Sequence, residues 1–155
     1  MWERIIIEFF ASYFLWLMFL GVFILWFYDG KIKKEQALHA FFVGSLAWIL
    51  AWIIKSIFPV ERPFQLNGEE AFVIIPLTNG AFPSGHTATA FAIAVTIWKH
   101  DRKMGIIYIL SAVIVGISRV LANVHYPVDV IAGAILGITT SLLLGRVHFK
   151  NLLKK

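Results

Sequence analysis

Cysteine is absent from this sequence, and charged residues are scarce. The lack of cysteine excludes disulfides and metal sites built from thiolates. Charged residues make up 15% of the 155 positions and hydrophobic residues 59%, whereas ordinary soluble chains are about 25% charged and about 45–50% apolar. Because the mean hydropathy is +0.79, we expect an integral membrane protein. The length suits one domain, which we expect to occupy residues 1–155.

Long apolar runs account for this composition. A transmembrane helix needs about 20 predominantly apolar residues, and the sequence predicts an all-α bundle of about five such helices. The expected spans are residues 5–28, 37–58, 84–98, 105–121 and 128–144. We expect the first span to be retained rather than cleaved as a signal peptide, because it lacks a small-residue cleavage site. Gly133 and Gly137, four residues apart in the last span, predict close helix packing within the chain.

Basic residues gather in three segments that flank these runs. Residues 29–35, 99–103 and 146–155 hold ten of the fourteen Lys and Arg residues. All three segments lie on one side if every run crosses the membrane, and basic loops favour the cytoplasm. The expected topology therefore has the amino terminus outside and the carboxyl terminus cytoplasmic, in a cytoplasmic (inner) membrane. Membrane topology and anionic lipid headgroups explain the basic residues in these loops, and with them the net charge of +5. We therefore expect the lipid bilayer as a partner and no nucleic acid.

Three polar clusters interrupt the apolar sequence at the opposite, outer face. Together they hold three cations, two imidazoles and one carboxylate, which is the inventory of a site that binds a phosphate and attacks it. The clusters are Lys55 to Arg62-Pro63, then Pro83-Ser84-Gly85-His86, then Ser118-Arg119 followed by His125 and Asp129. Ionisable groups at membrane depth are costly and usually mark function.

Each cluster alone also has a simpler interpretation. Lys55 could extend its ammonium group to the membrane interface, and the second cluster could be a capped helix start with an interfacial histidine. Asp129 could cap a helix beside an incidental His125. We favour one shared site because all three simpler interpretations would have to hold together on the same membrane face.

The residue types suit phosphoryl chemistry. Arginine offers a planar fork to two phosphate oxygens, and lysine offers a compact charge. A helix that starts at Ser84 presents unpaired N–H groups to an anion, and Gly85 lets a ligand approach the backbone closely. If a helix starts near Pro127, Asp129 can hold one ring nitrogen of His125 and leave the other as a nucleophile.

The three clusters resemble the signature of the type 2 phosphatidic acid phosphatase superfamily, Lys-x6-Arg-Pro, Pro-Ser-Gly-His and Ser-Arg-x5-His-x3-Asp, with every spacing kept. The resemblance covers the chain from the second to the fifth expected span. It implies that His125 attacks phosphorus to form a phosphohistidine, that Asp129 supports His125, and that His86 protonates the leaving oxygen and then activates water. It implies a metal-independent enzyme without cofactors. The residues that it implies for phosphate binding are Lys55, Arg62, Ser84, Gly85, Arg119 and, as a lesser member, Ser118.

We therefore expect an integral membrane lipid phosphatase that acts at the outer leaflet. The family's substrates include undecaprenyl diphosphate, lipid A 1-phosphate, phosphatidylglycerophosphate and phosphatidic acid. A chain this compact leaves little outer structure for soluble substrates, which slightly favours a prenyl or lipid A phosphate. Two alternatives stay open, a lipid phosphotransferase with the same phosphohistidine and a non-catalytic phospholipid-binding or transport protein. Membrane members of the family commonly have six spans, so this chain is expected to have one amino-terminal helix fewer. The sequence predicts no oligomeric state.

Overall fold

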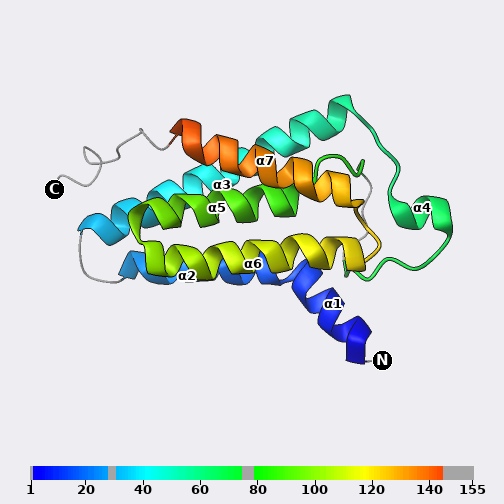
Figure 1. Ribbon diagram of the computed structural model, residues 1–155, viewed down its shortest axis with the longest axis horizontal. Helices are drawn as coiled ribbons and strands as arrows, with labels where there is room; N and C mark the ends of the chain where they lie inside the picture. The colour runs from blue at the N-terminus through cyan, green and yellow to red at the C-terminus, as the bar shows by residue number, and fades with distance from the viewer. Residues whose placement is uncertain (1, 28–30, 75–78, 145–155) are drawn as a thin grey trace.

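The computed structural model describes residues 2–27, 31–74 and 79–144, which form helices and no strand. The all-α fold predicted from the sequence is therefore confirmed. Figure 1 shows the long helices α2, α3, α5, α6 and α7 running side by side, with α1 angled away and the short α4 beyond the same end of the bundle. The helices are α1 (Trp2–Ser12), α2 (Phe14–Phe27), α3 (Lys31–Ile57), α4 (Pro63–Asn67), α5 (Gly85–His100), α6 (Arg102–Leu121) and α7 (Pro127–Leu144).

Helix α5 is the central element, packed against α6, α7 and α3. Its inner residues are mostly small, and Ala88, Ala90, Ala92 and Ala94 are fully buried. Small side chains let neighbouring helix backbones approach closely where lipid offers no hydrophobic driving force between helices. Helices α3, α6 and α7 therefore enclose α5, and this packing fixes the position of the start of α5 at one end of the bundle.

The closest of these contacts is with α7. A Cβ atom added at Gly133 would lie 2.5 Å from the carbonyl oxygen of Ser84, and one added at Gly137 would overlap the carbonyl oxygen of Ala88. The predicted role of the two glycines in packing within the chain is thus confirmed. Because the contacts are to backbone atoms of α5, neither glycine can be replaced without moving that helix.

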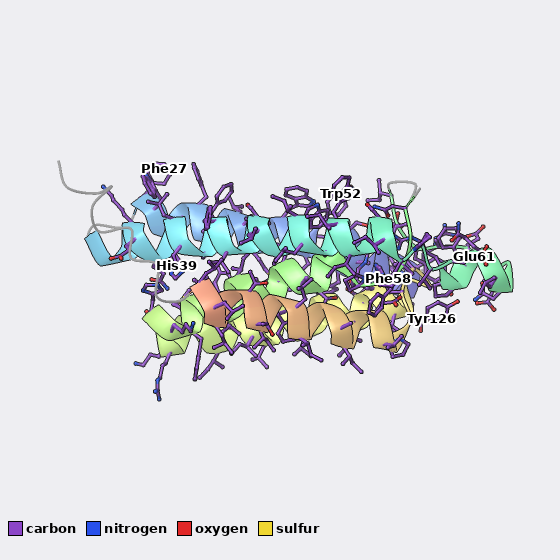
Figure 2. All side chains as sticks on the ribbon, turned by 90° about the horizontal axis from the view of Figure 1, so that it is seen from above. Phe27, His39, Trp52, Phe58, Glu61 and Tyr126 are labelled. Atoms are coloured by element: carbon purple, nitrogen blue, oxygen red, sulfur yellow. The ribbon has the colours of Figure 1, made fainter. Side chains whose placement is uncertain are left out.

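The outer surface of the bundle is apolar. Figure 2 shows Phe27 and Trp52 projecting outward from α2 and α3. Large side chains that are more than half exposed also cover α6 and α7, among them Ile107, Leu110, Ile131 and Ile135. Contiguous exposed apolar surface of this kind marks contact with lipid or another partner. It agrees with the membrane location expected from the composition.

Three helices in the described residues are long and apolar enough to cross a membrane, namely α3 from Lys34, α6 and α7. Helices α1 and α2 would form a fourth, broken span, bent by 48°. Helix α5 has 16 residues and rises about 24 Å, less than a typical span of about 20 residues. The expected number of five spans and their orientation therefore stay predictions.

The break between α1 and α2 corrects the expectation of one continuous helix over residues 5–28. No proline or glycine lies at the break, where Tyr13 separates the two helices. The carbonyl of Ala11 accepts a hydrogen bond of 2.6 Å from Nη1 of Arg119 in α6. A side chain that enters the helical hydrogen-bond ladder is a known cause of a kink. The bend thus arises from a residue more than a hundred positions away, which hydropathy does not reveal.

The other end of the bundle is joined by polar contacts among α3, α5 and α7. His39 of α3 lies 3.2 Å from His100 through their ring nitrogens, and its second nitrogen lies 3.0 Å from the carbonyl of Leu144. Lys99 donates to the carbonyl of Ser141 at 2.8 Å. This end also carries Asp101, whose side chain caps α6. The three polar clusters lie together at the opposite end, as the sequence predicts.

Candidate active site

A cavity of about 250 Å³ lies where the starts of α5 and α7 meet the ends of α3 and α6. Residues from all three polar clusters line it, together with residues from α1, α2 and the loop after α4. The lining residues are Ser12, Trp16, Trp48, Trp52, Lys55, Arg62, Val73, Asn79, Gly85, His86, Arg119 and His125. The structure thus brings six of the nine predicted site residues to one cavity.

Lys55 reaches the cavity from the last turn of α3. Its side chain is buried, and Nζ donates to the carbonyls of Gly80, Ala81 and Pro83 at 2.9, 3.1 and 2.9 Å. An ammonium group has three donors, so all of them are engaged with backbone. Lys55 therefore holds the segment that leads into α5, and it supplies positive charge to the cavity wall.

Arg62 precedes α4 and is 2% exposed. Nε and Nη2 donate to the carbonyl and the side-chain oxygen of Asn79, both at 2.9 Å, and Nη2 also donates to the carbonyl of Gly80. Nη1 donates to the carbonyl of Val124 at 2.9 Å and lies 3.4 Å from Nε2 of His125. Burial lowers the pKa of Arg62 to about 10, so the guanidinium stays charged at neutral pH.

Arg119 differs from the other two cations in keeping unpaired donors. Its side chain is 2% exposed, and Nη1 donates to Ala11. Nε is buried without a hydrogen-bond partner. A buried unsatisfied donor is costly, and a cationic one is a ready partner for an anion. Arg119 also lines the cavity, and it is the cation of the three whose hydrogen-bond donors are not all used by protein atoms.

His125 lies in the loop between α6 and α7 and is 2% exposed. Nδ1 lies 3.3 Å from Oδ2 of Asp129, which also accepts from the backbone N–H of Tyr126 at 2.8 Å. A protonated Nδ1 that donates to this carboxylate leaves the lone pair on Nε2. Burial, and then the charges of Arg119 and Arg62, hold the pKa of His125 well below its usual value of 6.5. The ring is therefore neutral and able to act as a nucleophile.

His86 stands in the first turn of α5 and lines the same cavity. Its ring packs against Trp48, with centroids 5.1 Å apart. Gly85 also lines the cavity. A Cβ atom at Gly85 would meet Trp48 and Ala51 at ordinary distances of 3.8 and 3.9 Å, so protein packing does not require glycine there. The close approach of a ligand to the backbone stays the predicted reason for this glycine.

Ser84 and Ser118 lie close to the cavity but are not among its lining residues. The hydroxyl of Ser84 accepts hydrogen bonds from the backbone and side chain of Thr87 and caps α5. Its backbone N–H donates to the carbonyl of Asp129 at 3.0 Å, which ties α5 to α7. The hydroxyl of Ser118 donates to the carbonyl of Val115 in its own helix at 2.8 Å. Phosphate binding by these two serines stays a prediction, and their contacts here are structural.

The electrostatic balance of the site favours an anion. Among the described residues, the buried Lys and Arg side chains are Lys55, Arg62 and Arg119, and the only buried carboxylate is Asp129. Buried charges are costly unless they are compensated, so three cations against one carboxylate leave positive charge that an anionic ligand would neutralise. The first turn of α5 adds the positive end of a helix dipole.

Comparison with known proteins agrees with this arrangement. A family model described as the PAP2 superfamily matches residues 36–153, which include all three clusters. The chain belongs to the PAP2 superfamily.

Individual relatives in this superfamily carry different names. A Bacillus licheniformis protein named bacitracin transport permease protein BcrC is 31% identical over 137 residues, which cover 88% of this chain and 68% of that protein. An undecaprenyl-diphosphatase of Sulfolobus acidocaldarius is 34% identical over 111 residues, covering 71% of this chain and 54% of that protein. The chain thus spans between about half and two thirds of the length of these relatives.

A solved structure supports the PAP2 fold. The first transmembrane PAP2 type phosphatidylglycerolphosphate phosphatase from Bacillus subtilis matches with a TM-score of 0.69 and 27% identity. The match covers 99% of this chain and 79% of that structure. The comparison therefore includes α1 and α2, which precede the residues matched by the PAP2 family model.

Six cavity residues of this PAP2 chain were not predicted from the sequence, and Trp52 and Val73 are two of them. Asn79 holds the guanidinium of Arg62, and Trp48 packs on His86. Ser12 and Trp16 enter the cavity from the break between α1 and α2, and the hydroxyl of Ser12 is buried without a partner. None of the six belongs to the three clusters. Only the Asn79-Gly80 pair carries a local signal, because such pairs favour turns.

Proposed function

We propose that this chain is an integral membrane lipid phosphatase that removes the terminal phosphate of a polyprenyl diphosphate. The observation that carries the proposal is the meeting of Arg119, His86 and His125 around one small cavity with excess positive charge. Phosphoryl transfer depends mainly on positioning and on stabilising spread negative charge. The cavity offers both, and the membership in the PAP2 superfamily supports the reaction class.

In the first step, Nε2 of His125 attacks the terminal phosphorus. The bond from phosphorus to the bridging oxygen breaks, and His86 gives a proton to that oxygen, so that the prenyl monophosphate leaves. Asp129 holds Nδ1 of His125 and stabilises the charge that forms on the ring. The contact between Nη1 of Arg62 and Nε2 is the longest that Arg62 makes, at 3.4 Å, and a phosphate oxygen would replace it most easily.

In the second step, water attacks the phosphohistidine. His86, now neutral, takes a proton from the water, and the bond between phosphorus and Nε2 breaks to release inorganic phosphate. The guanidinium of Arg119, which lines the cavity and keeps an unpaired donor, donates to a nonbridging oxygen in both steps. Lys55 and Arg62 contribute charge and hold the loops. No step requires a metal ion or a cofactor.

The choice of a prenyl diphosphate is supported by the named activity of the Sulfolobus acidocaldarius relative. The Bacillus subtilis structure is named for phosphatidylglycerolphosphate, so glycerophospholipids are the next substrates to test, followed by phosphatidic acid and lipid A 1-phosphate. We place the reaction at the outer leaflet of the cytoplasmic membrane, with five spans. The basic residues in segments 29–35, 99–103 and 146–155 support this orientation.

Phosphate release by the purified protein in detergent tests the proposal. The assay uses a panel of prenyl diphosphates, phosphatidylglycerophosphate, phosphatidic acid and lipid A, with and without a chelator. We expect release from prenyl diphosphate that the chelator leaves unchanged and that His125→Ala abolishes. A rate that survives His125→Ala would refute the nucleophile, and a rate lost to the chelator would refute the metal-free mechanism.

Two other functions would give different results. A phosphotransferase would move the phosphate of His125 to a lipid alcohol, so mass analysis of products with added acceptor lipids would reveal a phosphorylated acceptor. A transport protein is suggested by the name of the Bacillus licheniformis relative, bacitracin transport permease protein BcrC. Transport without catalysis predicts full biological activity in the His125→Ala variant, whereas the phosphatase predicts its loss.

A further inference from the structure

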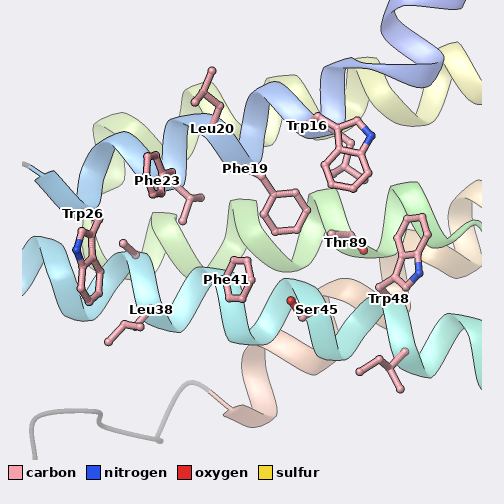
Figure 3. Close-up of a pocket in the computed structure, with 14 residues that line it drawn as sticks. Trp16, Phe19, Leu20, Phe23, Trp26, Leu38, Phe41, Ser45, Trp48 and Thr89 are labelled. Carbon is pink, nitrogen blue, oxygen red and sulfur yellow. The ribbon is translucent and has the colours of Figure 1, made fainter. Parts of the chain in front are cut away.

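A long apolar groove of about 800 Å³ runs between α2 and α3, outside the three polar clusters. Figure 3 shows Trp16, Phe19, Phe23 and Trp26 along one wall and Leu38, Phe41, Ser45 and Trp48 along the other, with Thr89 of α5 behind them. The remaining lining residues are Leu15, Leu20, Val22, Ala37 and Ile49. Both walls follow helical spacing, because residues three or four apart share one face of a helix.

The groove adjoins the catalytic cavity. Trp16 and Trp48 line both the groove and the cavity, and Trp48 also packs on the ring of His86. Figure 3 places these two indoles at one end of the groove, with Trp26 and Leu38 at the other. An apolar chain that lies in the groove therefore ends beside the group that we assign to protonate the leaving oxygen.

We propose that this groove binds the first part of the polyprenyl chain of the substrate while the diphosphate lies in the catalytic cavity. The proposal rests on the proposed function and deepens it. A prenyl diphosphate joins its single hydrocarbon chain directly to the diphosphate, without a glycerol or sugar between them. The protein makes a similarly direct change from polar to apolar surroundings, because only Trp16 and Trp48 line both the cavity and the groove.

Other lipids fit this junction less well. In a glycerophospholipid or lipid A, a polar glycerol or disaccharide separates the phosphate from the acyl chains. Where the cavity meets the groove, the shared side chains are the indoles of Trp16 and Trp48, which offer few polar contacts to such a group. These lipids also carry two or more chains, whereas the groove is a single channel between two helices. The geometry therefore favours a substrate in which a single hydrocarbon chain is joined directly to the diphosphate.

The groove is too short to hold a long prenyl chain entirely. From Trp16 to Trp26 the wall extends over ten residues of α2, or about 15 Å of helix rise, about half of a hydrocarbon core of about 30 Å. The rest of a long chain would stay in the bilayer. The rate constant kcat/KM is therefore expected to rise as the prenyl chain lengthens until the groove is filled, and then to level off.

A blocking substitution tests the groove. Ser45 lies midway along α3 between Phe41 and Trp48, so Ser45→Phe fills the channel without touching the catalytic cavity. We expect Ser45→Phe to lower kcat/KM for farnesyl diphosphate at least tenfold and for isopentenyl diphosphate less than twofold. Ile114→Phe is the matched control, because it adds a ring at an exposed position of α6 and should change neither value. An equal loss on both substrates, or no loss, would overturn the proposal.

Photo-crosslinking gives a second measurement that needs neither turnover nor the blocked variant. A farnesyl diphosphate with a diazirine at the far end of its chain is bound to full-length His125→Ala protein in detergent. We expect crosslinks to Phe19, Phe41 or Leu38 that excess unlabelled farnesyl diphosphate removes. Crosslinks to outward residues such as Leu110, or between two copies of the chain, would overturn the groove assignment.

The two measurements also separate this proposal from the proposed function. If the wild type releases no phosphate from any lipid, the phosphatase proposal fails, and competed crosslinks inside the groove would still place a prenyl chain there. If phosphatidic acid with two oleoyl chains loses activity in Ser45→Phe while farnesyl diphosphate does not, the phosphatase stands and the prenyl occupant is wrong.

Discussion

At the scale of single residues, the three site cations fall into two kinds. Lys55 and Arg62 direct all their hydrogen-bond donors at protein atoms, mostly backbone carbonyls of the segment 79–83. Arg119 keeps a buried Nε without a partner. The first two therefore build the cavity wall and supply charge, while Arg119 has donors left for a phosphate. A sequence motif that contains all three cations cannot show this division, because it depends on which carbonyls the fold brings near.

Asn79→Ala tests how much the orientation of Arg62 contributes. The substitution removes the 2.9 Å hydrogen bond from Nη2 to the side-chain oxygen and keeps the one to the backbone carbonyl. Hydrogen bonds to charged groups contribute about 1.5–3 kcal/mol. Asn79 is exposed, so we expect the lower end, which is roughly a tenfold loss in kcat/KM.

The matched control for this prediction is Asn67→Ala. Its amide, at the end of α4, exchanges hydrogen bonds with Asn123 in the loop between α6 and α7, without contact to Arg62. We expect kcat/KM to stay within twofold of the wild type. Similar losses in Asn67→Ala and Asn79→Ala would show that the effect comes from the loop as a whole.

The pH dependence of kcat/KM reports the ionisation of His125 in the free enzyme. His125 acts only when neutral, so activity falls as the pH drops through its pKa. Because burial and the charges of Arg119, Arg62 and Lys55 lower that pKa, the acid limb is expected below pH 6.5. Within the described part of the chain, Asp129 is the carboxylate in contact with the ring. A pH series of initial rates measures the limb.

Arg119→Gln distinguishes the titration of His125 from that of the substrate. Removing one positive neighbour raises the pKa of His125, so the acid limb of the residual activity moves to higher pH. A limb set by the lipid phosphate would stay at the same pH in both proteins. An unshifted limb would therefore contradict the assignment to His125.

At the scale of elements, hydropathy predicted where the chain is apolar but not where helices begin and end. The expected span 84–98 lies almost wholly within α5, and 128–144 agrees with α7. Helices α3 and α6 begin earlier than expected, at Lys31 and Arg102, because helical backbone continues into polar residues that hydropathy excludes. The short α4 and the break at Tyr13 were missed.

The motifs predicted the site residues by spacing alone, whereas Ser12 and Trp16 reach the cavity only through the break between α1 and α2.

Packing of α7 on α5 leads to a prediction at this scale. Gly137→Val places a side chain against the backbone carbonyl of Ala88, and overpacking of this kind costs about 1–3 kcal/mol. Because α5 carries His86 in its first turn, we expect a lower melting temperature in detergent together with lower kcat. Thr139→Val, at an exposed position of the same helix, is the matched control and should change neither. Normal stability and activity in Gly137→Val would contradict the tight contact.

At the scale of the whole molecule, the two ends of the bundle carry different polar groups. One end carries the cavity and α4, which ends at Asn67, and the other carries Asp101 between α5 and α6. The sequence predicts that the three polar clusters share one end, and the structure brings them together there. Which end faces the cytoplasm depends on insertion into the membrane, which is governed by loop charges and not by contacts within the fold. Orientation must therefore be measured on the protein in its membrane.

Cysteine labelling measures this orientation directly, because the chain contains no native cysteine. Asn67 and Lys103 are both exposed and lie at opposite ends of the bundle. In intact cells, a membrane-impermeant maleimide is expected to label Asn67→Cys at once and Lys103→Cys only after the membrane is permeabilised. Both variants should retain phosphatase activity, which verifies that the labelled protein is folded. Labelling in the reverse order would place the cavity on the cytoplasmic side, and the substrate would then have to be a lipid phosphate of the inner leaflet.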